Sequence, residues 1–242
     1  MTIPYSTIER NGDLNEYITP PQLIRACVSL VKDYHTADSP LVVLDPGCNL
    51  GQWGDVLKTV YPDACLTGVE LLDVPPNPNY VVWTPNTDFL TWNSPVLFNV
   101  IIGNPPYSIY TPDKTGKNRR KTVVNTWVKH SLDLLTPGGT LIYVLREGFN
   151  HNVYAWKHIL TANPPVKEYL LLPRPNFFGK HDPRTDGSSG ARYNYSVFVW
   201  QKGYEGQTIE VPLYWKDIPH ETLEEKKDTA PTEVPLPCAA EG

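Results

Sequence analysis

Short apolar runs alternate along the chain with stretches whose apolar residues recur at helical spacing. The runs predict buried strands at 41–44, 66–69, 98–102 and 140–145. The helical spacing predicts helices within 23–31, 56–60, 124–135 and 153–160. Two further strands are expected at 168–172 and 195–200, with a polar loop between them. Because strands alternate with helices, we expect an α/β fold with a mostly parallel sheet covered on both faces.

The last part of the chain has a different composition. Residues 217–242 carry seven acidic and two basic side chains and are rich in proline, so we expect a disordered tail. This tail accounts for the net charge of −5, and residues 1–216, expected to form a single domain, are therefore neutral. Any contact with nucleic acid would then have to come from local basic patches.

We searched the sequence for targeting signals, membrane segments and cysteine motifs. No apolar run is long enough for a membrane helix, and no signal peptide is visible, so we expect a cytoplasmic protein with no membrane partner. The four cysteines show no CxxC spacing, and free thiols are expected. No metal site is predicted.

The sequence Asn104-Pro105-Pro106-Tyr107 follows the apolar run 98–102 after one residue, Gly103. The two prolines fix the backbone and remove two N–H donors. What remains is a set of acceptors, namely the Asn104 side-chain oxygen and the carbonyls of Asn104 and Pro105, beside an aromatic ring. This combination suits a planar ligand that carries an amino group.

Acidic residues follow the first predicted strands. The turn at 45–51 lacks both the GxGxxG fingerprint and the P-loop lysine, which argues against NAD and against ATP phosphates. Glu70 ends the second strand, where it can accept hydrogen bonds from a ribose. Asp88 and Phe89 follow the next segment, where the carboxylate could bind an adenine amine and the ring could stack on the base.

In this order, the motifs resemble those of the gamma-type N6-adenine DNA methyltransferases, whose cofactor motifs precede NPPY. The resemblance covers about 17–202, and the late segments 172–179 and 195–200 are similar to phage and prophage enzymes of this class. It implies a Rossmann-like, S-adenosylmethionine-dependent fold with a late antiparallel strand. One departure is Asn49, which stands where the family has glycine, and this puts cofactor affinity in question.

The resemblance also implies roles for individual residues. S-adenosylmethionine would be held by Tyr17, Thr19, Pro20, Asp45, Pro46, Gly47, Gly51, Glu70, Asp88, Phe89 and Asn104. Asn104 to Tyr107 would bind the N6 amine of a flipped adenine, and the methyl group would transfer directly. Tyr107 and either Phe177 or Phe178 would stack on the base.

Two basic segments are predicted to contact the DNA backbone and to recognise the target, at 113–122 and 173–194. The first contains Lys114, Lys117, Arg119, Arg120 and Lys121. The second contains Arg174, Lys180, His181, Arg184 and Arg192. Double-stranded DNA is the expected partner of a monomer or weak dimer, in a bacterial or virus-infected cell.

Alternative functions remain at this point. RNA adenine or guanine amines pose the same chemical problem, as does the glutamine amide of a protein substrate. The glutamine methyltransferases usually carry a helical N-terminal domain, for which the residues before Tyr17 leave no room. A non-catalytic cofactor-binding module is the fourth possibility, and the intact NPPY sequence argues against it. Cytosine C5 methylation is disfavoured because no cysteine follows a proline near the active strand.

Overall fold

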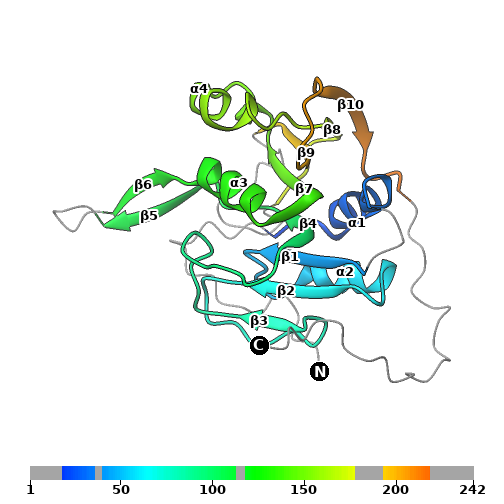
Figure 1. Ribbon diagram of the computed structural model, residues 1–242, viewed down its shortest axis with the longest axis vertical. Coiled ribbons are helices and arrows are strands. Elements are labelled where there is room, and N and C mark those ends of the chain that lie inside the picture. The colour runs from blue at the N-terminus through cyan, green and yellow to red at the C-terminus, as the bar shows by residue number, and fades with distance from the viewer. Residues whose placement is uncertain (1–17, 36–39, 113–117, 178–192, 219–242) are drawn as a thin grey trace.

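The computed structural model describes residues 18–35, 40–112, 118–177 and 193–218 of the 242-residue chain. Within these residues, eight strands form one sheet in the order β10-β8-β9-β7-β4-β1-β2-β3 (Figure 1). Their bounds are β1 (Val42–Pro46), β2 (Cys65–Val69), β3 (Val82–Thr84), β4 (Phe98–Gly103), β7 (Leu135–Arg146), β8 (Lys167–Leu172), β9 (Tyr195–Gln201) and β10 (Ile209–Tyr214).

Neighbouring strands of this sheet are parallel, with one exception. Strand β9 runs antiparallel to β7 and β8 on either side of it. The other described pairings of this sheet are all parallel, namely β3 with β2, β2 with β1, β1 with β4, β4 with β7, and β8 with β10. The predicted α/β fold, with a mostly parallel sheet and a late antiparallel strand, is confirmed.

Helices cover both faces of the sheet, as predicted. Helices α1 (Pro21–Ser29) and α2 (Gln52–Val60) pack on one face, and Val43 of β1 belongs to that apolar core. Helix α3 (Val124–Asp133) packs on the other face, where Leu44 belongs to a second core. Adjacent residues of β1 thus serve opposite cores, because side chains alternate along a strand.

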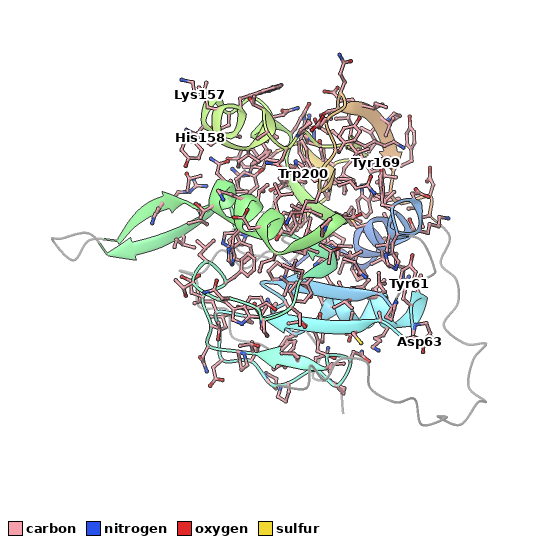
Figure 2. The ribbon with its side chains drawn as sticks, viewed as in Figure 1. Tyr61, Asp63, Lys157, His158, Tyr169 and Trp200 are labelled. Carbon is pink, nitrogen blue, oxygen red and sulfur yellow. The ribbon has the colours of Figure 1, made fainter. Side chains whose placement is uncertain are left out.

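The second face also receives a short helical segment after β7. It consists of η3 (Glu147–Phe149), α4 (Val153–Ala155) and the π-helical turn η4 (Trp156–Leu160). Figure 2 shows Trp200 among the side chains of the interior, whereas Lys157 and His158 lie at the outer edge of this segment. A 3-10 turn, η2 (Val31–Asp33), follows α1 on the first face.

A two-stranded hairpin follows the NPPY sequence and projects away from the body of the protein (Figure 1). It pairs β5 (Ser108–Pro112) with β6 (Asn118–Thr122) in antiparallel register. The expectation of a basic loop over 113–122 is therefore wrong for 118–122, which form a strand. Residues 113–117 lie outside the described part of the chain.

Two other expectations need comment. Cys27 and Cys48 are free and buried, but Cys65 is disulfide-bonded, so the prediction of free thiols is wrong at that position. Among the described residues, no helix has the length and apolar character needed to cross a membrane. The predicted tail at 217–242 falls almost entirely outside the described ranges and stays a prediction.

Candidate active site

The candidate site lies where the strand order of the sheet reverses. From β1 the chain proceeds outward to β2 and β3, whereas β4 and β7 lie on the opposite side of β1. The carboxyl ends of parallel strands flanking such a switch point form the usual ligand crevice of open α/β sheets. Asp45, Glu70, Gly103 and Arg146 stand at or beside the ends of β1, β2, β4 and β7.

The turn after β1 is held by backbone hydrogen bonds to β2. The Gly47 N–H donates to the Val69 carbonyl at 2.7 Å, and the Asn49 N–H donates to Glu70 Oε2 at 2.7 Å. Gly47, Asn49 and Gly51 all have positive φ, at 70°, 49° and 85°. Asparagine tolerates this left-handed conformation, so the turn forms despite the departure from glycine at Asn49.

Glu70 is fixed by the same turn. Its side chain is buried, and its second carboxylate oxygen accepts a hydrogen bond of 3.0 Å from the Leu72 N–H. Each carboxylate oxygen has two acceptor sites, so one backbone donor on each leaves capacity for a ligand hydroxyl. The geometry therefore fits the predicted role in holding a ribose.

Asp45 is a nearly fully buried carboxylate, with 1% of its surface exposed. Its Oδ2 accepts a hydrogen bond of 2.5 Å from the Tyr80 hydroxyl, which itself accepts from the Gly54 N–H at 2.9 Å. Among the described residues, Asp45 Oδ1 has no hydrogen-bond partner. Burial, together with the nearby Glu70, raises the pKa of Asp45 to about 7. Since an unsatisfied buried acceptor is costly, this oxygen fits a ligand that brings a hydrogen-bond donor.

Asn104 is anchored by a residue from the beginning of the chain. Its side-chain nitrogen donates a hydrogen bond of 3.2 Å to Thr19 Oγ1. Thr19 is 3% exposed and lies just before α1. Because one end of the planar amide is held by Thr19, the oxygen at its other end has a defined position beside the buried Pro105.

Tyr107 is tied to the end of β7. Its hydroxyl donates to the Arg146 carbonyl at 3.2 Å and accepts a hydrogen bond from the Arg146 N–H. The Arg146 guanidinium lies over the Tyr107 ring, 4.7 Å from its centroid, and 4.1 Å from the centroid of the Tyr193 ring. One face of Tyr107 is thus covered by a cation, and a base that stacks on that face must displace it.

A cavity of about 440 Å³ opens beside this stack. It is lined by Tyr107, Arg146, Glu147, Gly148, Arg174, Tyr193 and Asn194. Arg174, from the second predicted basic segment, therefore lies at the same cavity as Tyr107 of the NPPY sequence.

The other predicted site residues that the structure describes differ in how deeply they are buried. Phe89 is 2% exposed and packs in the core, with its ring centroid 4.6 Å from that of Trp127. Asp88 is exposed, and its Oδ1 accepts from the Leu90 N–H at 2.9 Å. Phe177 is also buried, 4.6 Å from Tyr195 between ring centroids. Pro20 is half-buried, Pro46 and Gly51 are buried, and Pro106 is half-buried. In this arrangement Phe89 and Phe177 have little surface to offer a ligand, and their stacking roles stay predictions.

The predicted cations are described in part. Arg120 and Lys121 on β6 are exposed, and Arg120 Nε donates to Ser108 Oγ at 2.6 Å. Arg119 occupies a position on the same strand. The remaining predicted contacts, Tyr17, Lys114, Lys117, Phe178, Lys180, His181, Arg184 and Arg192, lie outside the described residues.

Several residues at the site escaped prediction, among them Tyr80, Arg146 and Tyr193. Arg146 follows directly on the apolar run 140–145, so its place at a strand end was available as a signal. Tyr80 and Tyr193 carry no such signal, because each reaches the site through a loop. Among the described residues, no group of histidine, cysteine or acidic side chains could hold a metal ion.

Comparison with known proteins begins with relatives in sequence, and no family model matches the chain. The chain is 31% identical over 150 residues to the Type II methyltransferase M.TthHB8I of Thermus thermophilus, covering 52% of this chain and 33% of that protein. It is 25% identical over 153 residues to the ribosomal RNA large subunit methyltransferase E of Rhizorhabdus wittichii, covering 57% of this chain and 66% of that protein. The chain thus spans about a third of the first relative and just under two thirds of the second.

Solved structures identify the fold. A Listeria monocytogenes protein described as a class I S-adenosylmethionine-dependent methyltransferase matches with a TM-score of 0.64 at 12% identity, covering 88% of this chain and 70% of that one. The methyltransferase subunit of a type I restriction-modification system from Streptococcus thermophilus matches with a TM-score of 0.62 at 16% identity, covering 81% and 47%. The chain has the fold of the class I S-adenosylmethionine-dependent methyltransferases.

Proposed function

We propose that this chain is an S-adenosylmethionine-dependent DNA methyltransferase that acts on the N6 amine of adenine. The observation that carries the proposal is the Asn104-to-Tyr107 sequence at the switch point of this fold, with the Asn104 amide held by Thr19. The similarity to a type II methyltransferase and to a restriction-modification subunit supports DNA as the substrate.

The residues at the switch point fit the cofactor. Glu70 would bind the ribose hydroxyls, because its two oxygens are already oriented by backbone donors. The unsatisfied Asp45 Oδ1 would accept a hydrogen bond from the ammonium group of the methionine part. Tyr17 to Pro20 and the turn at 45–47 would hold the same part through the main chain, and Asp88 with Phe89 would hold the adenine. When bound, S-adenosylmethionine supplies a methyl group on a positively charged sulfur.

Asn104 and Pro105 would prepare the adenine amine for attack. The N6 lone pair of adenine is delocalised into the ring, so N6 is a poor nucleophile. Hydrogen bonds from N6 to Asn104 Oδ1 and to the Pro105 carbonyl would favour a pyramidal nitrogen and stabilise the positive charge that develops there. As N6 bonds to the methyl carbon, the bond between that carbon and the cofactor sulfur would break, and S-adenosylhomocysteine would leave. N6 would lose a proton to solvent, and no covalent bond to the enzyme would form.

Tyr107 would then be the stacking surface for the flipped base. Extrusion of a base from a duplex costs a few kcal/mol, and stacking on an aromatic ring offsets about 1–3 kcal/mol. The cation–π contact between the Arg146 guanidinium and the Tyr107 ring, which the base must replace, is worth about 0.5–2 kcal/mol. The two contacts are similar in size, so a base can take the place of the guanidinium.

The second candidate is methylation of an RNA amine, which the similarity to a ribosomal RNA methyltransferase favours. The same pocket chemistry would serve either nucleic acid, and the 2′-hydroxyl would be the distinguishing group.

A substrate assay separates these possibilities. Protein and radiolabelled S-adenosylmethionine are incubated separately with unmethylated genomic DNA, total RNA and a protein extract, and label in each polymer is counted. The proposal expects label in DNA, lost in Asn104→Ala and kept in the control Asn93→Ala, which changes an exposed asparagine. Label confined to RNA would move the function to the second candidate, and label confined to protein would overturn both.

A further inference from the structure

Three separate segments meet at the cavity beside Tyr107. Arg146 is the last residue of β7, Arg174 follows the end of β8, and Tyr193 precedes the start of β9. Because β9 is antiparallel to its neighbours, its beginning lies at the same edge as the ends of β7 and β8. The one antiparallel strand of the sheet therefore delivers Tyr193 to the candidate active site.

The cavity presents a fixed cation. The Arg146 guanidinium lies against the rings of Tyr107 and Tyr193, at 4.7 and 4.1 Å from their centroids. Contact with two aromatic rings restrains the guanidinium. Tyr107 is itself tied through its hydroxyl to the Arg146 backbone, so the cation and the NPPY sequence are positioned as one unit.

The charge of the lining favours an anion. Among the described residues that line the cavity, Arg146 and Arg174 are basic and Glu147 is acidic, so these residues carry a net positive charge. Arg174 is exposed, which leaves its guanidinium accessible to a ligand that enters from solvent. Planar guanidinium groups bind phosphate oxygens in pairs, and they do so better than a lysine ammonium.

We infer that this cavity is a phosphate site, in which Arg146 and Arg174 bind the backbone phosphodiester next to the target nucleotide. The inference rests on the proposed function, and it adds a binding site that neither the NPPY sequence nor the cofactor residues provide. Tyr107 lines the cavity and also belongs to the base site, so a phosphate here is within the same nucleotide or its neighbour.

The site also explains how the stack on Tyr107 can open. A base that stacks on the covered face displaces the Arg146 guanidinium, which would lose its contact with the ring. A phosphate that arrives with the same nucleotide gives the guanidinium a new, charge-assisted partner. Arrival of the base and binding of the phosphate are thus coupled through Arg146.

The test is a scan with neutral linkages. Fluorescence anisotropy measures binding of DNA duplexes, and of RNA of the same sequence, in which one phosphodiester at a time around an adenine is replaced by methylphosphonate. At one linkage the unmodified protein should lose roughly 10- to 100-fold in affinity. Arg174→Ala should bind the phosphodiester and the methylphosphonate equally at that linkage, and it should keep the losses at other linkages. Arg146→Gln should do the same, whereas Arg146→Lys should keep part of the discrimination.

Controls separate the outcomes. Lys129→Ala, an exposed change on α3, should reproduce the unmodified profile. Because Arg146 is bound to Tyr107, its variants are checked by thermal melting, and Arg174→Ala tests the site without that risk. If Arg174→Ala keeps the full methylphosphonate penalty at every linkage, the phosphate site is refuted, while methyl transfer to nucleic acid leaves the proposed function standing. Failure to bind DNA or RNA at all would overturn both.

Discussion

Thr19 accepts a hydrogen bond of 3.2 Å from the side-chain nitrogen of Asn104, although 85 positions separate the two residues in the chain. The contact joins the segment before α1 to the end of β4, and it fixes which end of the Asn104 amide faces the hydroxyl. Thr19 was expected to hold the cofactor. The structure gives it a contact with the proposed catalytic amide as well, so we regard Thr19 as a positioning residue.

Removal of the Thr19 hydroxyl should therefore slow methyl transfer more than it weakens cofactor binding. Thr19→Val keeps the shape but removes the acceptor, and we expect kcat to fall about 10- to 100-fold because a loosely held catalytic group is poorly oriented. Thr19→Ser should restore most of the rate. Steady-state kinetics measure this, and an unchanged kcat with a raised KM for S-adenosylmethionine would assign Thr19 to the cofactor alone.

The Tyr107 hydroxyl should stabilise the fold as well as the site. Tyr107→Phe keeps the ring for stacking but removes the hydroxyl that the Arg146 N–H and carbonyl contact. Loss of such a partner at a largely buried position should lower the free energy of unfolding by about 1–3 kcal/mol. Denaturant titration measures the change. Tyr154→Phe, at a tyrosine that is 56% exposed, should have almost no effect, and equal effects in the two variants would argue against the contact between Tyr107 and Arg146.

Gly54 should be intolerant of any side chain. A Cβ at this position would lie 2.3 Å from the Tyr80 ring, which it would push away from Asp45. Gly54→Ala should therefore destabilise the protein by about 1–3 kcal/mol and weaken cofactor binding. Gly148→Ala is the matched control for stability, because a Cβ there meets nothing within 4 Å. Equal melting temperatures for the two variants would contradict the close packing of Gly54 against the Tyr80 ring.

Stability should fall as the pH rises from about 4 to about 7. The pKa of Asp45 rises from 3.8 to about 7 through burial, and that of Glu168 rises from 4.5 to about 7 for the same reason. Because the folded state holds these protons more tightly than the unfolded state, the stabilisation is complete below the ordinary pKa and is lost as the pH passes through 7. Asp45→Asn should match the unmodified protein near pH 4 and be more stable at pH 8.

Unfolding titrations at several pH values check this prediction. Glu168→Gln should also flatten the profile, and Glu205→Gln, at an exposed glutamate, should leave it unchanged. If the free energy of unfolding instead rises between pH 4 and 7, the carboxyl groups of Asp45 and Glu168 are ionised and well paired in the folded protein.

The hairpin should contribute the salt dependence of DNA binding. Each phosphate contact that is lost should reduce the slope of log affinity against log salt by about 1. Lys121→Ala on β6 removes an exposed cation, and Lys129→Ala on α3 is the control. Equal slopes for the two variants, measured by anisotropy, would exclude β6 from the nucleic-acid interface.

Much of this arrangement could be predicted from local sequence. Strands β1, β2 and β4 contain the mainly apolar runs 41–44, 66–69 and 98–102, with Thr67 and Asn99 as polar exceptions. Asp45, Glu70 and Asn104 stand at or just after the ends of these runs. Strand order could not be read from the runs, but parallel strands bring their carboxyl ends together whatever their order. The central residues of the proposed cofactor site could therefore be predicted from the sequence alone.

Other parts depend on tertiary contacts that leave no local pattern. Strand β3 has only three residues, and β10 is an edge strand that contains Pro212, so neither has a continuous apolar run. Strand β6 reads as a basic loop because its residues are polar on both sides. Tyr80 and Tyr193 reach the site from loops, and the burial of Phe89 and Phe177 depends on neighbours distant in the chain.

The identity of the methylated nucleoside tests the account most directly. The protein is incubated with unmethylated DNA and S-adenosylmethionine that carries a deuterated methyl group, and the digested nucleosides are resolved by mass spectrometry. We predict deuterated N6-methyladenine, absent with Asn104→Ala and present with Asn93→Ala. Label on cytosine, or N6-methyladenine that persists in Asn104→Ala, would contradict the role assigned to the Asn104-to-Tyr107 sequence.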